Sequence, residues 1–198
     1  MKLYGNAASP FARKCRVIAY ELGIALEEVR TLPMQEPEFR KVNPLGKIPA
    51  LQLDDGSVLI DSPVICEYLN DKGGGKFFPA DTIWKAASGR WKALGLAALG
   101  DGIADAAVAW IILGRETPVP EAGRKRQMET VLAGLDALER VKFADPPTIG
   151  EITVACAIGY VEFRMPDLDW KSSRPNLSAW YAKICERPSM KATAAAAP

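Results

Sequence analysis

The chain contains no histidine among its 198 residues. This absence excludes the Ser-His-Asp and Cys-His arrangements in which histidine acts as the base. Any acid–base or nucleophilic chemistry must therefore use other side chains, or a nucleophile that the ligand itself brings to the protein.

Cysteine is scarce as well, with four residues at positions 15, 66, 156 and 185. No two of them form a CxxC pair, which argues against a dithiol redox centre and against a cysteine-type zinc site. Each cysteine falls within an apolar helical pattern, so we expect four small core residues and no metal site.

The sequence also lacks an excess of charge and a long apolar run. The net charge is +1, so nothing favours nucleic acid or an anionic membrane as a partner. We find no apolar run of about 18 residues, the length of a spanning helix, and no signal peptide at the start. These features indicate a cytoplasmic protein. With 48% hydrophobic residues, the chain can bury one large core or two small ones.

A strand–helix–strand pattern opens the chain. Residues 2–4 and 26–30 are strand candidates. Ser9-Pro10 opens a helix between them, with serine as the N-cap and proline at the first helical position. Because the connections are short, the pattern predicts a βαβ unit with parallel strands.

The stretch Val42–Leu69 predicts strand, turn, strand and helix. Ala50–Leu53 and Ser57–Ile60 are the strands, and the Asp-Asp-Gly sequence between them suits a hairpin turn. Asp61-Ser62-Pro63 then has the composition of a helix start. An α/β fold with the order βαβ-ββα is therefore expected up to the glycine-rich linker KGGGK at 72–76.

The rest of the chain is expected to be helical. Segments are predicted from Asp81 to Leu113, from Glu121 to Val141, from the capping box at Thr148 to Pro166, from Asn176 to Glu186, and after Arg187. Several glycines weaken the first of these segments, and close packing of helices would explain them, within one chain or across a dimer interface.

Two features of the stretch Val42–Leu69 suggest a binding site. Pro49 directly precedes a strand, and a cis bond there would leave the backbone N–H and C=O of Ile48 free for an extended peptide ligand. The helix start at Asp61-Ser62 offers free N–H groups and a partial positive charge to a carboxylate. Taken singly, each feature is equally explained by a plain turn or a plain helix cap.

Together these motifs resemble the cytosolic glutathione transferase family. The resemblance rests on NPLGKIPAL followed by DS, on SPF at 9–11, and on PNLSAWYAKICERPSMKAT near the end, and it spans nearly the whole chain. It is closest to the bacterial-type, Ser-Pro-Phe branch. The resemblance implies a thioredoxin-like domain over 1–76 and an all-α helical domain over 77–198.

The resemblance also implies a set of glutathione-binding residues. Ile48, the residue before the cis proline Pro49, would pair its backbone with the cysteinyl part of glutathione. Asp61 and Ser62 would hold the γ-glutamyl end. Glutathione would then be a co-substrate whose sulfur is the nucleophile, which explains how a chain without histidine can be an enzyme.

Ser9 is the catalytic candidate that the resemblance favours. Its hydroxyl and the helix dipole would stabilise the glutathione thiolate. Phe11 and Lys47 match positions that line the glutathione site in related branches. Tyr4 is a competing activator of the thiol. Arg13, four residues after Ser9, either faces the same binding site or is a solvated or ion-paired arginine. The alternative is that Ser9 serves only as a helix cap.

The expected function is conjugation of glutathione to a small electrophile by a homodimer. The apolar second-substrate site should lie between the domains, near Phe11, Trp110 and Phe163. Asp101 and Asp105 could reach the γ-glutamyl ammonium bound by a partner subunit. The alternatives are a glutathione-dependent reductase, isomerase or dehalogenase on the same fold, and a binding or regulatory protein without catalysis.

Overall fold

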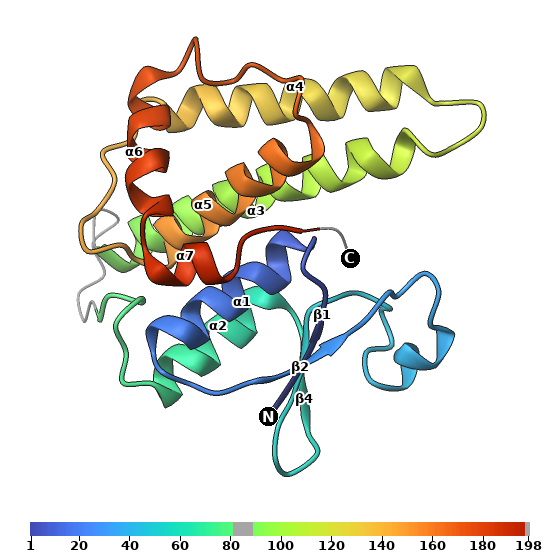
Figure 1. The fold of residues 1–198 in the computed structure, drawn as a ribbon, viewed down its shortest axis with the longest axis vertical. Coiled ribbons are helices and arrows are strands. Elements are labelled where there is room, and N and C mark those ends of the chain that lie inside the picture. The colour runs from blue at the N-terminus through green and yellow to red at the C-terminus, as the bar shows by residue number, and fades with distance from the viewer. Residues whose placement is uncertain (81–88, 197–198) are drawn as a thin grey trace.

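The computed structural model describes residues 1–80 and 89–196 as a small mixed sheet below a larger layer of helices (Figure 1). The sheet half has the predicted order. Its elements are β1 (Lys2–Gly5), α1 (Pro10–Glu21), β2 (Glu27–Arg30), the 3-10 helix η1 (Pro37–Lys41), β3 (Ala50–Gln52), β4 (Val58–Leu59) and α2 (Ser62–Lys72).

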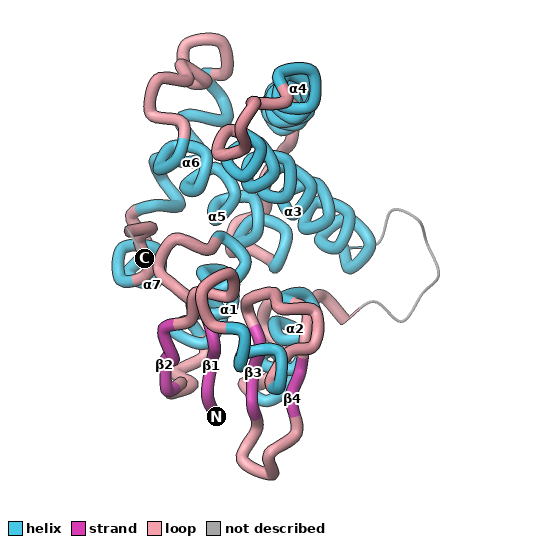
Figure 2. Tube along the Cα trace, turned by 90° about the vertical axis from the view of Figure 1, so that its right-hand side faces the viewer, coloured by secondary structure: helices cyan, strands magenta, loops and turns pink. Residues whose placement is uncertain are grey.

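The four strands lie in the order β2-β1-β3-β4 (Figure 2). β1 pairs with β2 in parallel, as the βαβ pattern predicts, and it pairs with β3 antiparallel. Side chains alternate across a strand, so Leu3 and Gly5 share one face of β1 while Tyr4 lies on the other. The space for a Cβ at Gly5 is taken by the side chain of Ala12, 2.8 Å away, which places α1 against the face of Leu3 and Gly5.

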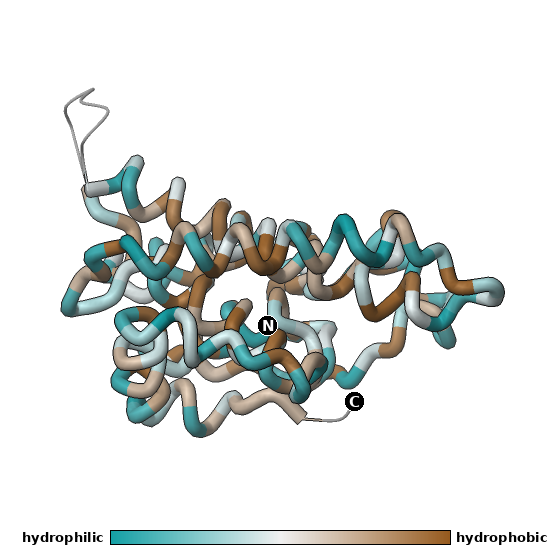
Figure 3. Tube along the Cα trace, turned by 90° about the horizontal axis from the view of Figure 1, so that it is seen from above, coloured by the Kyte–Doolittle hydropathy of each residue, from teal (hydrophilic) through white to brown (hydrophobic). Residues whose placement is uncertain are grey.

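The helical half consists of long helices whose residues mix hydrophobic and hydrophilic types (Figure 3). Its elements are α3 (Gly89–Leu113), α4 (Glu121–Leu138), α5 (Ile149–Arg164), α6 (Pro175–Cys185) and α7 (Pro188–Ala192). α3 packs against both α4 and α5. The predicted start of the first helix at Asp81 lies outside the described residues, and the thioredoxin-like plus all-helical architecture is confirmed.

Close approach explains two of the glycines in this half. A Cβ at Gly100 would lie 2.9 Å from the backbone nitrogen of Val154, so α3 and α5 touch through their backbones. A Cβ at Gly134 would lie 2.5 Å from the side chain of Ile103, which fixes α4 against α3 in the same way. Gly95 and Gly102, in contrast, face open space and are not explained by packing within the chain.

α3 corrects one expectation about hydrophobic runs. By length and composition alone it could cross a membrane, with a mean hydropathy of 1.7 over its most apolar 18-residue window. The core helix of a soluble protein passes the same test, so this is weak evidence. α3 packs against α4 and α5, and 33% of that window is buried inside the structure.

Polar contacts join α1 to the helical half. The buried ammonium of Lys14 lies 2.7 Å from both carboxylate oxygens of Asp101 on α3. At the other end of α1, the carboxylate of Glu21 accepts hydrogen bonds from the Arg187 guanidinium at 2.7 and 2.8 Å. The hydroxyl of Ser189 donates a further bond to Glu21 at 2.6 Å. These contacts hold α1 in a defined position under α3, α5 and α7.

Candidate functional site

Ser9 is the N-cap of α1. Its backbone is extended, with φ −77° and ψ 121°, and its Oγ accepts a hydrogen bond from the Ala12 N–H at 3.2 Å. A serine hydroxyl also carries one donor and a second lone pair. Within the described residues the Ser9 hydroxyl donates to no partner, so capping leaves its proton available. The capping role and a role toward a ligand are therefore compatible.

The loop before β3 presents an unpaired backbone. The Ile48–Pro49 bond is cis, as the sequence predicts. Tyr4 is aligned with Ala50 across the β1–β3 ladder, so Pro49 lies beside the end of β1 that leads to Ser9. Neither backbone group of Ile48 makes a hydrogen bond to any described residue. This is the condition for pairing with an extended peptide.

Asn43 shapes that loop, and it was missed at the level of sequence. It is buried, with 2% exposure, and its side-chain amide donates to the Lys47 carbonyl at 2.6 Å. Its carbonyl oxygen accepts from the Leu45 N–H at 3.0 Å. The only signal available was an asparagine before proline, which is typical of turns in general. The side chain of Lys47 itself is exposed.

The start of α2 carries the second pair of predicted residues. Asp61 is the N-cap, and its carboxylate accepts from the Ser62 N–H at 2.6 Å. The Ser62 hydroxyl lies 3.5 Å from the same carboxylate, at the limit of a hydrogen bond, although Ser62 is only 1% exposed. The preceding Ile60–Asp61 bond is also cis, which no sequence signal indicated.

Contacts between α1 and α2 bring these residues into one region. The Sγ of Cys15 lies 3.8 Å from the Ser62 carbonyl, and it lies 3.7 Å from the Sγ of Cys66. The start of α2 therefore lies against α1 in the sheet domain. Phe11, at the start of α1, is partly buried and packs against the hydrophobic core.

Two alternative assignments become weaker in the structure. Tyr4 faces away from α1, and its hydroxyl donates to the Gln52 side chain at 3.2 Å. Arg13 is neither solvated nor ion-paired with a described residue. It is 5% exposed, and its guanidinium donates to the Met190 carbonyl at 3.1 Å. Cys15 is fully buried, as predicted for a core residue, and burial is the main reason that its thiol pKa is raised well above the ordinary value.

The two acidic residues of α3 divide in their roles. Asp101 is paired with Lys14 of its own chain, so it is not a free carboxylate. Burial lowers the pKa of Lys14, but its negative partners, Asp101 among them, outweigh burial and leave that pKa raised. Asp105 is exposed, and its pKa is raised by partial burial and by the nearby carboxylates of Asp101 and Asp61. Asp105, but not Asp101, remains a candidate for an ammonium partner.

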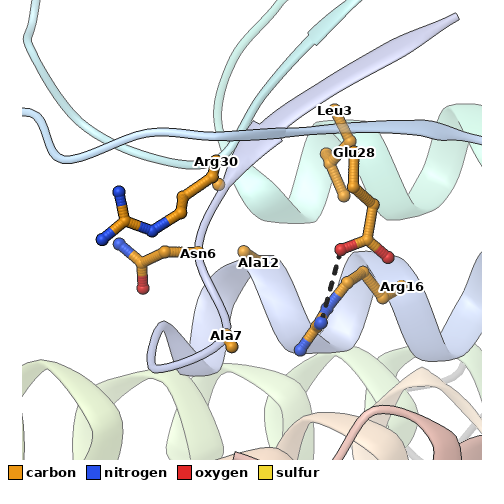
Figure 4. A pocket seen from close by; sticks show the side chains of 8 residues that line it. Leu3, Asn6, Ala7, Ala12, Arg16, Glu28 and Arg30 are labelled. Atoms are coloured by element: carbon orange, nitrogen blue, oxygen red, sulfur yellow. Dashed lines mark hydrogen bonds and ion pairs between the residues drawn. The ribbon is translucent and has the colours of Figure 1, made fainter. Parts of the chain in front are cut away.

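A separate hollow of about 230 Å³ lies between α1, β1 and β2 (Figure 4). Arg16 and Glu28 are ion-paired at 3.4 Å on one side, and Arg30 lies beside Asn6 on the other. Its remaining lining residues are Leu3, Gly5, Ala7 and Ala12. None of the predicted glutathione residues lines it. Among the described residues there is also no group of three or more His, Cys, Asp or Glu side chains that could hold a metal ion.

Comparison with known proteins identifies the family. The model of the glutathione S-transferase N-terminal domain matches residues 8–72, and that of the C-terminal domain matches residues 121–183. The uncharacterized GST-like protein YibF of Escherichia coli K12 is 32% identical over 98% of both chains. The chain belongs to the glutathione S-transferase family.

Solved structures of family members agree over nearly the full length of the chain. A glutathione transferase family member from Pseudomonas fluorescens Pf-5, with bound glutathione, superposes with a TM-score of 0.88 at 40% identity, covering 99% of each chain. A second structure from that organism contains S-(propanoic acid)-glutathione, with a TM-score of 0.83. The glutathione S-transferase from Methylobacillus flagellatus KT, with glutathione bound, is 36% identical with a TM-score of 0.88, covering 98% of this chain and 99% of that one.

Proposed function

We propose that this protein is a glutathione transferase that conjugates the glutathione thiolate to small electrophiles. The observation that carries the proposal is the Ser9 hydroxyl, which caps α1 through one lone pair and keeps its proton for a thiolate. In the reaction the thiolate sulfur attacks an electrophilic carbon, a carbon–sulfur bond forms, and the leaving group departs with its bonding electrons. The protein lowers the pKa of the thiol and positions the electrophile.

Glutathione is proposed to bind along three segments: the start of α1 at Ser9, the loop before β3, and the start of α2. The free backbone groups of Ile48 pair with its cysteinyl unit, and Pro49 fixes their direction. Asp61 and Ser62 hold the γ-glutamyl end, with the Ser62 hydroxyl toward its carboxylate, since a helix start favours an anion. Relatives with 40% and 36% identity bind glutathione in their crystals, which supports this assignment.

Phe11 and Lys47 are proposed as further lining residues. Lys47 is exposed, and its positive charge, which partly offsets the rise in the pKa of Asp105, is available for a glutathione carboxylate. Phe11 lies two residues after Ser9 and is only partly buried. It would border both the thiol and the second substrate.

The proposal also covers the branch of the family, the compartment, the domain bounds and the assembly. We place the protein in the bacterial Ser-Pro-Phe branch and in the cytoplasm, with domain bounds at 1–76 and 77–198. We also propose a homodimer. Trp91 on α3 and Val64 on α2 are 49% and 48% exposed, and Gly95 and Gly102 face open space, which a second copy could fill.

A different reaction on the same site is the second candidate. A relative named dichloromethane dehalogenase, from Methylorubrum extorquens, is 27% identical over 96% of this chain and 72% of its own length. Dehalogenation by glutathione begins with the same attack of sulfur on carbon. A serine at position 9, where a cysteine would favour thiol–disulfide exchange, argues against a reductase.

Calorimetric titration with glutathione, followed by conjugation assays with a reactive aryl halide, tests the proposal. We expect saturable one-site binding and a rate above the uncatalysed reaction. Binding without conjugation of any electrophile would favour a regulatory protein, and absence of binding would overturn the assignment altogether. Sedimentation at micromolar concentration tests the homodimer separately.

A further inference from the structure

Residues at the C-terminal end of α5 indicate the chemical class of the second substrate. This inference rests on the proposed function. α1 and α5 run antiparallel in contact with each other (Figure 1). A Cβ at Gly159 would lie 2.2 Å from the Arg13 guanidinium, so these two positions face each other. Ser9 lies one turn before Arg13, and Phe163 lies one turn after Gly159, so Ser9, Phe163 and Arg164 lie toward the same end of the α1–α5 pair.

Arg164 is held in place without a negative partner. Its guanidinium carbon lies 4.5 Å from the centre of the Phe163 ring and 5.9 Å from that of Tyr160. Its Nε is buried and has no hydrogen-bond partner. Within the part of the chain that the structure describes, Arg164 forms no ion pair. The buried Arg174 of the same half, in contrast, is ion-paired with Asp136 at 2.6 Å.

Arg115 adds a second positive charge to the same place. It follows the end of α3, is exposed, and also forms no ion pair with a described residue. Burial raises the pKa of Tyr160, and the charges of Arg164 and Arg115 partly offset that rise. Two guanidinium groups without an ion pair to a described residue favour an anion, because each leaves donors that no carboxylate of the described chain satisfies.

We propose that the electrophile conjugated by this enzyme carries a carboxylate, which Arg164 binds while Arg115 adds attraction. The electrophilic carbon then lies toward the thiolate at Ser9, and the body of the molecule lies against Phe163. For a halide substrate the thiolate attacks the carbon, the carbon–halogen bond breaks, and halide leaves with the electron pair. The carboxylate takes no part in the bond changes, and its role is to orient the substrate.

Two preformed conjugates test the proposal without requiring turnover. S-(4-carboxybenzyl)glutathione and S-benzylglutathione differ only in the carboxylate. Their dissociation constants are measured by calorimetry beside that of glutathione itself. We expect the wild-type protein to bind the acidic conjugate about tenfold or more tightly than the neutral one, since a hydrogen bond to a charged group has that effect on affinity.

Matched variants assign the preference to Arg164. In Arg164→Gln the affinity ratio of the two conjugates should fall to about one. Arg126→Gln removes the same charge from an exposed position on α4 and should keep the wild-type ratio. If Arg164→Gln does not fold, Arg115→Gln should lower the ratio in part, and about 1 M salt should reduce it in the wild-type protein, because charge interactions are then screened within about 3 Å.

The outcomes separate this inference from the proposed function. Glutathione binding with equal affinity for the two conjugates overturns the carboxylate preference and leaves the transferase assignment intact. A preference that survives in Arg164→Gln overturns the role of Arg164. Failure to bind glutathione overturns both.

Discussion

Two regions around α1 differ in how far their polar groups are paired. In the domain junction, formed by Lys14, Glu21, Asp101 and Arg187, each charged group meets an opposite charge at 2.7 Å. In the loop edge, formed by Ser9, Ile48 and Ser62, backbone or hydroxyl groups stay without a partner or make only a long contact.

This difference separates structural from binding groups. An unpaired polar group that is shielded from water costs free energy, so a fold retains one only where something else supplies the bond. The junction is complete in the isolated chain. Under the proposed function, a bound peptide such as glutathione would complete the loop edge. Changes in the junction should therefore act on stability, and changes in the loop edge on binding and chemistry.

The largest expected effect comes from breaking the junction at Asp101. Asp101→Leu would leave the Lys14 ammonium buried without its partner, and the free energy of unfolding should fall by about 3–5 kcal/mol. Replacing both residues, as Lys14→Met with Asp101→Leu, should recover much of that loss because no charge is then buried. Urea unfolding of the three proteins measures this, and a single variant as stable as wild type would contradict the junction's role.

Removing the Ser9 hydroxyl tests the loop edge, where the main effect is expected on chemistry and not on stability. Ser9→Ala should cost about 1 kcal/mol of stability as a lost cap. The pKa of bound glutathione thiol should rise by about one to two units, since a hydrogen bond to a charged group contributes about 1.5–3 kcal/mol. Absorbance of the thiolate against pH measures the shift, and conjugation should fall at pH about 7 and recover in part above it.

Ser9→Thr is the matched control, because threonine keeps both the cap and the donor. It should retain most of the thiolate that Ser9→Ala loses. If Ser9→Ala leaves the titration and the rate unchanged, then Ser9 is only a cap, and Asn6 or the helix dipole would be left as the activator.

Ser62 should affect binding with little change in stability. Its hydroxyl makes only a 3.5 Å contact within the protein, so Ser62→Ala breaks no short bond of the fold. Affinity for glutathione should fall by about 1–3 kcal/mol through a lost carboxylate contact. Calorimetry on the folded variant checks this, with Ser57→Ala, an exposed serine in the β3–β4 turn, as the control. Equal affinity in wild type and Ser62→Ala would remove Ser62 from the site.

Local signals made most of the fold predictable. Ser9-Pro10 and Asp61-Ser62-Pro63 predicted the starts of α1 and α2, because a side-chain cap and an early proline act within one helical turn. The cis Ile48–Pro49 bond was predicted from a proline directly before a strand together with the family resemblance, and it is confirmed. The roles of Ser9, Phe11 and Lys47 toward glutathione stay predictions.

Long-range pairing was not predictable. Arg13-Lys14 looks like a solvated stretch, yet both side chains are buried, since each finds a partner from the distant helical half. Asp101 seemed free for a partner subunit because nothing in its own helix pairs with it. Such contacts depend on how two halves of the chain dock, and residue types alone do not reveal that arrangement.

The smallest expected effect is the pH response of the junction at Glu21. Burial raises the pKa of this carboxyl, but hydrogen bonds from Arg187 and Ser189 outweigh burial and lower it below the ordinary value of 4.5. Because the pKa is lower in the folded state, the stabilisation is present above about pH 4.5 and is lost as the pH falls through the folded-state pKa.

Glu21→Gln should therefore be less stable than wild type at neutral pH, and this difference in stability should disappear on acidification. Glu129→Gln, at an exposed position on α4, should show no such convergence. Urea midpoints measured between about pH 3 and about pH 7 decide the matter, and a gap that stays constant with pH would show that the Glu21 charge contributes nothing to the junction.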